Sequence, residues 1–150
     1  MKYQKKVLIV CSNYYSRVSN DLLKDAIKIL KVAKIKTSIV NAPGVFEIPF
    51  IISKNINKYD GFVALGCVIK GETPHFDFIS KSSINGIMSL SIKYKKPIGN
   101  GILTCLTMKQ AVARSTIKGN KRKGKEATEA LLSVLSIKWR KRKLFKTQEW

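Results

Sequence analysis

The only histidine of the chain, His75, stands in a polar stretch that could carry out acid–base chemistry. This stretch reads Gly71-Glu72-Thr73-Pro74-His75 and follows a long apolar run. Because imidazole titrates near neutral pH, His75 could both donate and accept a proton. The start of a following helix would favour an anion such as phosphate beside Glu72 and Thr73. In a purely structural alternative, Thr73 caps that helix and Pro74 occupies its first position.

Three further side chains offer binding chemistry. Arg114 follows Gln110 by one helical turn in an otherwise apolar segment, and a planar guanidinium can bind two oxygens of a phosphate. Alternatively, Arg114 forms a salt bridge on a solvated helix face. Glu47 follows Phe46 and could accept hydrogen bonds from a ligand, or cap a helix. Tyr14 could stack on a planar heterocycle, or simply pack at the rim of a sheet.

Short apolar runs predict the strands that would position these groups. The runs are rich in β-branched residues, which is typical of parallel strands buried on both faces. Strands are expected over residues 7–11, 37–40, 61–69 and 97–106.

Amphipathic patterns predict the helices between and after the strands. Ser19 or Asn20 is expected to cap the first helix, and Pro49 suits the first turn of the second. Helices are expected over residues 21–33, 47–57, 76–94, 107–115 and 125–143.

Strands that alternate with helices predict an α/β fold with a parallel sheet covered by helices on both faces. In such sheets, ligands bind beyond the carboxyl ends of the strands. The four loops that follow the strands are therefore expected to line one site. These loops cover residues 12–16, 42–47, 70–75 and 104–107.

Length and composition favour one globular domain over residues 1–150, with a short arm at 1–6 and a basic tail at 140–150. Hydrophobic residues make up 45% and charged residues 25%, which argues against disorder. No apolar run is long enough for a membrane span or a signal peptide, so we expect a cytoplasmic protein. The three cysteines lack disulfide or zinc spacing, and reduced core thiols are expected.

The strong basicity does not by itself define a partner. A formal net charge of +20 would attract nucleic acid, anionic membranes or small anionic substrates alike. Basic clusters at 120–125 and 139–143 are accompanied by no zinc-finger, P-loop or RNA-binding motif. Nucleic acid is therefore not an expected partner. A single histidine also argues against a catalytic zinc site.

Together, the segments resemble the lumazine synthase family along nearly the whole chain, from about residue 7 to the last helix. Two long motifs carry most of the resemblance, and two shorter ones, Gly101-Ile102-Leu103-Thr104 and Gln110-Ala111-Val112-Ala113-Arg114, agree in order. The long motifs read Pro43-Gly44-Val45-Phe46-Glu47-Ile48-Pro49 and Ala64-Leu65-Gly66-Cys67-Val68-Ile69-Lys70-Gly71-Glu72-Thr73-Pro74-His75-Phe76-Asp77.

The resemblance implies a flavodoxin-like three-layer αβα sandwich with a central four-stranded parallel sheet. It implies condensation of 5-amino-6-(D-ribitylamino)uracil with 3,4-dihydroxy-2-butanone 4-phosphate in riboflavin biosynthesis. The products would be 6,7-dimethyl-8-ribityllumazine, phosphate and water, formed without a metal or an organic cofactor. It also implies pentamers, which in some members form a capsid, and association with riboflavin synthase.

The resemblance also assigns residues to roles. His75 matches the proton-transfer histidine, and Arg114 matches the arginine that binds phosphate. Asn100 matches a position that contacts the pyrimidine from a neighbouring subunit. The positions that match substrate-binding residues are Tyr14, Val45, Phe46, Glu47, Cys67, Val68, Ile69, Glu72, Thr73, Asn100, Arg114 and Lys123.

Within this set, the resemblance distinguishes three subsites. Tyr14 would stack on the pyrimidine, and residues 45–47 would hold the ribityl chain and ring. The backbone of residues 67–69 would bind the uracil edge. Residues 72–73 would contact the phosphorylated ketone. Glu126 would orient His75 or Arg114.

One departure from the family pattern concerns the link before the last helix. The family has a short Asn-Lys-Gly link, whereas this chain has Asn120-Lys121-Arg122-Lys123-Gly124. Lys123 is aligned with the family's lysine near the active site, and Lys121 is the alternative. The longer, charged link favours a pentamer or decamer over a capsid. Two other functions stay open: a protein of this fold that only binds flavin or lumazine, and a basic scaffold that binds RNA.

Overall fold

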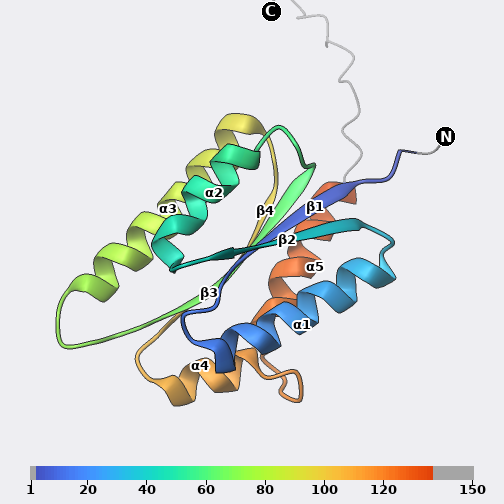
Figure 1. Cartoon of the computed structure of the whole chain (residues 1–150). Helices are drawn as coiled ribbons and strands as arrows, with labels where there is room; N and C mark the ends of the chain where they lie inside the picture. Colours follow the sequence, from blue (N-terminus) through green and yellow to red (C-terminus); the bar gives the residue numbers. More distant parts are fainter. Residues whose placement is uncertain (1–2, 137–150) are drawn as a thin grey trace, which may run out of the picture.

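The computed structural model describes residues 3–136 and contains a four-stranded parallel sheet (Figure 1). The strand order is β2-β1-β3-β4, and all three neighbouring pairs are parallel. The strands are β1 (Lys6–Ser12), β2 (Lys36–Ala42), β3 (Gly61–Ile69) and β4 (Ile98–Cys105).

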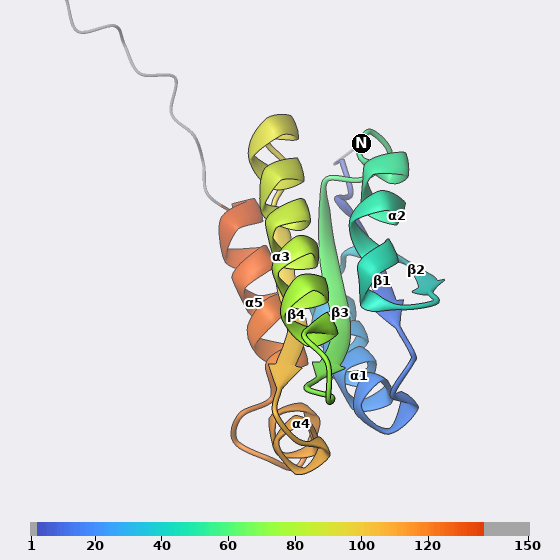
Figure 2. The same cartoon turned by 90° about the vertical axis from the view of Figure 1, so that its left-hand side faces the viewer.

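Helices cover both faces of this sheet (Figures 1 and 2). Helices α1, α4 and α5 pack on one face through a core that includes Leu22, Ala111 and Leu131. Helices α2 and α3 and the short 3-10 helix η1 pack on the other face. The helices are α1 (Ser16–Val32), η1 (Val45–Glu47), α2 (Ile48–Asn55), α3 (His75–Tyr94), α4 (Met108–Ser115) and α5 (Lys123–Ser136). The predicted three-layer αβα sandwich is thereby confirmed.

Apolar side chains on both faces of the central strands bind the layers together. In β3 every residue from Gly61 to Val68 is buried, and successive side chains enter the two cores in turn. The chain runs from β1 to β2 on one side and then crosses β1 to reach β3 on the other. This reversal opens a crevice beyond the carboxyl ends of β1 and β3, where α/β proteins bind ligands.

Helix α1 begins five residues before the predicted start, so the predicted caps are wrong. Tyr15 is the N-cap residue, and its side chain makes no capping hydrogen bond. Ser19 lies inside the helix, where its buried hydroxyl donates to the backbone oxygen of Ser12 at 2.8 Å. Ser16 and Arg17 carry no apolar signal, and the helix begins there because the Tyr15 backbone oxygen accepts hydrogen bonds from the Val18 and Ser19 N–H groups at 3.0 and 2.9 Å.

The other boundaries differ by smaller amounts. Strand β2 is longer than predicted, β4 is slightly shorter, and a 3-10 turn precedes α2, which ends at Asn55. Thr107 lies just before α4 as its N-cap, and its hydroxyl accepts a hydrogen bond from the Gln110 N–H at 3.2 Å. Helix α5 begins two residues early, and the predicted helical residues 137–143 and the predicted tail lie outside the described range. No helix within residues 3–136 is long and apolar enough to cross a membrane.

Candidate functional site: two pockets at the carboxyl edge of the sheet

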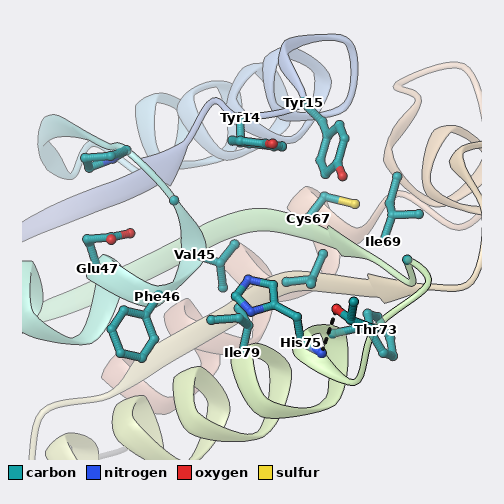
Figure 3. A pocket seen from close by; sticks show the side chains of 15 residues that line it. Tyr14, Tyr15, Val45, Phe46, Glu47, Cys67, Ile69, Thr73, His75 and Ile79 are labelled. Atoms are coloured by element: carbon teal, nitrogen blue, oxygen red, sulfur yellow. Dashed lines mark hydrogen bonds between the residues drawn. The ribbon is translucent and has the colours of Figure 1, made fainter.

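Three of the predicted loops meet at a cavity of about 480 Å³ (Figure 3). The loop after β1 contributes Tyr14 and Tyr15, and the segment after β2 contributes residues 43–47. The end of β3 and its loop contribute residues 67–69, Gly71 and Thr73. Helix α3 closes the cavity with His75 and two apolar side chains. We call this cavity the aromatic pocket.

Aromatic surfaces at the mouth of this pocket are open to solvent. The side chain of Tyr14 is 73% exposed, and that of Phe46 is 60% exposed. The Tyr14 ring stands edge-on to Tyr15, with the ring centroids 4.9 Å apart. Exposed aromatic faces of this kind can stack on a planar heterocycle. The arrangement therefore suits a flat, conjugated ligand.

Helix η1 is held against the rest of the fold, and this placement sets Phe46 and Glu47 at the pocket. The backbone oxygen of Val45 accepts a hydrogen bond from the buried Ser83 hydroxyl of α3 at 3.3 Å. Strand β3 comes so close that a Cβ on Gly66 would lie 2.7 Å from Cγ2 of Val45. A glycine at position 66 is thus required for this close approach, and it keeps η1 in contact with the sheet.

His75 is the first residue of α3 and enters the aromatic pocket from the side opposite Tyr14 (Figure 3). Its backbone N–H lies 3.4 Å from the Thr73 hydroxyl, which accepts the hydrogen bond. Pro74 is the N-cap residue, so the prediction of Thr73 as cap and Pro74 as first residue is wrong by one position. Because Pro74 has no N–H to donate, the Thr73 hydroxyl accepts its hydrogen bond from the N–H of the next residue, His75. Glu72 is exposed on the same loop and does not line the cavity.

A second pocket, of about 500 Å³, lies beside β4, α4 and the start of α5. We call it the basic pocket because it holds Arg114, Lys121 and Lys123 with a single carboxylate, Glu126. Arg114 is half-buried, and its Nη1 donates to the backbone oxygen of Gln110 at 3.2 Å. This bond directs the guanidinium along its own helix towards the carboxyl end of β4.

Asn100 lines the basic pocket from within β4. Its side-chain oxygen accepts a hydrogen bond from the Ile102 N–H at 3.0 Å, which holds the amide in place. Glu126 pairs with Lys123 at 2.9 Å and lines the same pocket as Arg114, and its role in orienting His75 or Arg114 stays a prediction. A carboxylate on the first turn of α5 reaches the lysine one turn before it, on the same helix face.

Apart from Glu72, which lines neither pocket, the predicted site residues are divided between two pockets of the chain. Tyr14, Thr73, His75 and residues 45–47 and 67–69 line the aromatic pocket, whereas Asn100, Arg114 and Lys123 line the basic pocket. Within one chain, three of the four predicted loops line the aromatic pocket, and the fourth contributes Thr104 and Cys105 to the basic pocket. Strand β4 is at the edge of the sheet, and its loop leads into α4 on the other face.

The three cysteines are free and buried, as predicted. Burial raises the pKa of the Cys67 thiol to about 12, with a smaller contribution from Cys105, and burial raises that of Cys11 to about 11. A thiol with such a pKa stays protonated near neutral pH and is a poor nucleophile. Cys67 can therefore shape the aromatic pocket without reacting in it.

Sequence reasoning missed several pocket residues. Phe76 and Ile79 line the aromatic pocket and Asn120 lines the basic one without having been predicted to do so, whereas Tyr15 and Thr104 lie in loops that were predicted to line the site but were given no role of their own. Tyr15 carried a signal, because it follows Tyr14 in a loop after a buried strand. Within residues 3–136, no group of three or more histidine, cysteine, aspartate or glutamate side chains is arranged to hold a metal ion.

Comparison with known proteins identifies the family. A model described as 6,7-dimethyl-8-ribityllumazine synthase matches residues 4–138. The 6,7-dimethyl-8-ribityllumazine synthase of Bartonella henselae is 44% identical over 138 residues, which cover 89% of this chain and 88% of the relative. The one of Bartonella tribocorum is 40% identical over 143 residues, covering 93% and 94%. That of Methylobacterium radiotolerans is 40% identical over 135 residues, covering 89% and 82%.

These matches span nearly the same residues as the fold, and they include both long motifs around the aromatic pocket. Identity of about 40% over such a length confirms the family that the motifs predict. The chain belongs to the 6,7-dimethyl-8-ribityllumazine synthase family.

Proposed function

We propose that the chain condenses 5-amino-6-(D-ribitylamino)uracil with 3,4-dihydroxy-2-butanone 4-phosphate to form 6,7-dimethyl-8-ribityllumazine, phosphate and water. Membership of the family supports this reaction. The observation that carries the proposal for the site is the aromatic pocket, in which open aromatic faces, a carboxylate and the only histidine of the chain lie together.

The aromatic pocket suits the uracil substrate. Tyr14 and Phe46 offer exposed rings for stacking, and the end of β3 offers backbone groups to the edge of the heterocycle. Glu47 can accept hydrogen bonds from the ribityl hydroxyls or from ring N–H groups. We assign this pocket to 5-amino-6-(D-ribitylamino)uracil.

The basic pocket suits the phosphate of the second substrate. Arg114 offers a planar fork for two phosphate oxygens, and two lysines add positive charge. Only one carboxylate, Glu126, opposes these three cations. We assign this pocket to the phosphate of the butanone substrate and to the phosphate that leaves.

Because the two substrates must react, the two pockets have to meet, and we propose that they do so between neighbouring subunits. The aromatic pocket of one copy would face the basic pocket of the next. Such a heterologous contact closes into a ring when the rotation allows, and we propose a pentamer. Helix α3 supports a contact between copies, because Phe78, Met88 and Ile92 are 66%, 59% and 70% exposed.

The proposed chemistry begins when the substrate amine attacks the ketone and loses water to form an imine. His75 moves protons to and from the reacting groups in this step and in the elimination that follows. Arg114 stabilises the charge on the phosphate as it leaves. The pocket also holds two reactants together that would otherwise meet rarely. No protein nucleophile is needed, which agrees with the protonated state of the Cys67 thiol.

We further propose a cytoplasmic location, because three free, buried cysteines suit a reducing compartment. Association with riboflavin synthase stays a prediction, and co-purification of the two proteins would test it.

The direct test of the proposed function supplies both substrates to the purified full-length chain. We expect lumazine fluorescence and one phosphate released for each lumazine formed, with neither signal when one substrate is omitted. A protein that quenches riboflavin fluorescence but forms no product would contradict the proposal. So would phosphate release without lumazine.

A further inference from the structure

The lengthened link between α4 and α5 is attached to α1 by a partly buried ion pair. The Arg122 guanidinium donates to both carboxylate oxygens of Asp25, from Nε at 3.1 Å and from Nη2 at 2.5 Å. The Asp25 side chain is 2% exposed and that of Arg122 is 28% exposed. The two residues are 97 positions apart in the chain. The pair thus joins the link to a helix that belongs to the rigid core.

A second contact holds the same segment against α1. Gly124 is buried, and a Cβ at this position would lie 2.9 Å from Cα of Leu22 and still closer to the Leu22 backbone oxygen. Leu22 and Asp25 are three residues apart and therefore lie on the same face of α1. The link is held at two neighbouring points on one helix face, once through its backbone and once through Arg122.

The two residues that flank Arg122 line the basic pocket, whereas Arg122 does not. Lys121 and Lys123 both line the basic pocket, together with Arg114. Lys123 is also paired with Glu126, whereas Lys121 forms no ion pair with a carboxylate in residues 3–136. Three consecutive cations repel one another, and Asp25 draws the middle one away from the pocket. Of these three consecutive cations, only the two lysines line the basic pocket beside Arg114.

We propose that Asp25 and Arg122 are positioning residues that fix Lys121 and Lys123 beside Arg114 for binding of the phosphorylated substrate. This inference rests on the proposed function, because it concerns the phosphate side of that site. Neither residue of the pair lines the basic pocket. A buried ion pair gains little stability over apolar residues of similar size, so its value here is the geometry that it imposes.

The experiment compares Arg122→Met with Lys125→Met in the full-length chain. Both remove one positive charge from the same segment, but Lys125 takes part only in a 3.9 Å contact with Glu129 and lies outside the basic pocket. We expect Arg122→Met to raise KM for the phosphorylated substrate about tenfold, with KM for the uracil substrate unchanged. The dissociation constant of inorganic phosphate should rise by a similar factor. Lys125→Met should change neither value.

Two further variants separate positioning from folding. Arg122→Lys keeps the charge and should recover part of the phosphate affinity. Arg122→Met leaves a buried carboxylate without its partner, and the double variant Asp25→Asn/Arg122→Met removes that charge. We expect the double variant to regain thermal stability while its KM for the phosphorylated substrate stays high. If its KM returns to the wild-type value, or if Arg122→Met leaves KM and phosphate affinity unchanged, the inference is overturned.

The test also distinguishes this inference from the proposed function. Should the wild-type chain form no lumazine, the proposed reaction fails, and the affinity for inorganic phosphate alone then decides whether the pair positions the lysines. Should the wild-type chain be active while all variants bind phosphate equally well, the positioning role fails and the function stands.

Discussion

His75 and Arg114 follow neighbouring strands of one sheet, yet they line separate pockets of the chain. His75 begins α3 after β3, on the face covered by α2 and α3, whereas Arg114 lies in α4 after β4, on the opposite face. In the proposed reaction one moves protons and the other holds phosphate, so both must act on the same molecules. Two copies of the chain would supply one group each.

Mixing two inactive variants tests this shared site. His75→Ala chains keep the basic pocket, and Arg114→Ala chains keep the aromatic pocket. The two variants are unfolded together and refolded as mixed assemblies. Half of the aromatic pockets and half of the basic pockets are then intact, and each shared site needs one of each, so we expect about a quarter of the sites to be intact. Activity should then exceed the mean of the two parents and approach about one quarter of the wild-type value.

The matched control mixes His75→Ala with Phe46→Ala. Both residues line the aromatic pocket of the same chain, so no mixture of these variants can rebuild it. No gain over the parents is expected. Recovery in this control, or its absence in the first mixture, would contradict a site shared between copies.

Substitutions at Arg114 should lower kcat/KM for the phosphorylated substrate in particular. Arg114→Ala removes the fork for two phosphate oxygens, and we expect kcat/KM to fall by about 10²-fold or more. Arg114→Lys keeps the charge without the fork and should recover only part of that loss. Steady-state kinetics with each substrate varied in turn measures both effects.

Lys28→Ala serves as the control for net charge. Lys28 is exposed on α1 and lines neither pocket, so its removal lowers the long-range attraction of the basic protein without touching the site. An equal loss of activity in Lys28→Ala and Arg114→Ala would show that Arg114 acts only through its general charge.

The proton-transfer role of His75 predicts a loss in kcat rather than in binding. We expect His75→Ala to lower kcat by about 10²-fold, within the range for loss of a general acid–base group, with small changes in either KM. Removal of this exposed side chain should leave the N-terminus of α3 unchanged, because it is the backbone N–H of His75 that donates the hydrogen bond to Thr73. Added imidazole should restore part of the rate in His75→Ala. An unchanged kcat would exclude the assigned role.

Much of the fold could be predicted because the patterns there are local. The bounds of β3 agree with the prediction at both ends, since an apolar run begins at Gly61 and stops before the charged Lys70. The start of α1 could not be predicted, because Ser16 and Arg17 are polar and exposed. Their helical conformation follows from the backbone hydrogen bonds that the Val18 and Ser19 N–H groups donate to the Tyr15 oxygen, which no side-chain pattern indicates.

The candidate site was predictable residue by residue but not in its arrangement. Motifs indicated His75 and Arg114, and the sheet rule placed their loops at one edge. The face of the sheet to which each loop leads depends on how the following helix packs, and no sequence motif indicates that packing. The pairing of Asp25 with Arg122 is a stronger case, because 97 positions and three whole βα units separate them.

The buried thiols predict a specific dependence on pH. The pKa of Cys67 is raised from 9.0 to about 12 in the folded chain, chiefly by burial. Above about pH 9 the unfolded chain releases a proton that the folded chain keeps, so the unfolding free energy falls as pH rises from about 9 towards 12. Urea unfolding at several pH values measures this slope, and Cys67→Ala should make it shallower.

Alkylation gives an independent measurement of the same property. At about pH 8 the folded chain should react with iodoacetamide far more slowly than the chain in denaturant, where the thiols regain their ordinary pKa. Fast alkylation of Cys67 in the folded chain would contradict both the burial and the raised pKa.

The contact between β4 and α5 predicts how two glycines differ in their tolerance of a side chain. A Cβ on Gly99 would meet the backbone oxygen of Ala127 and lie 3.1 Å from its carbonyl carbon, whereas a Cβ on Gly71 would meet nothing within 4 Å. Neither glycine has a positive φ, so alanine fits the backbone at both positions. We expect Gly99→Ala to lower the unfolding free energy by about 1–3 kcal/mol, because α5 must move off the sheet. Gly71→Ala should change it by less than about 0.5 kcal/mol. Urea unfolding at one fixed chain concentration measures both, and equal midpoints would show that α5 does not pack on β4 as closely as described.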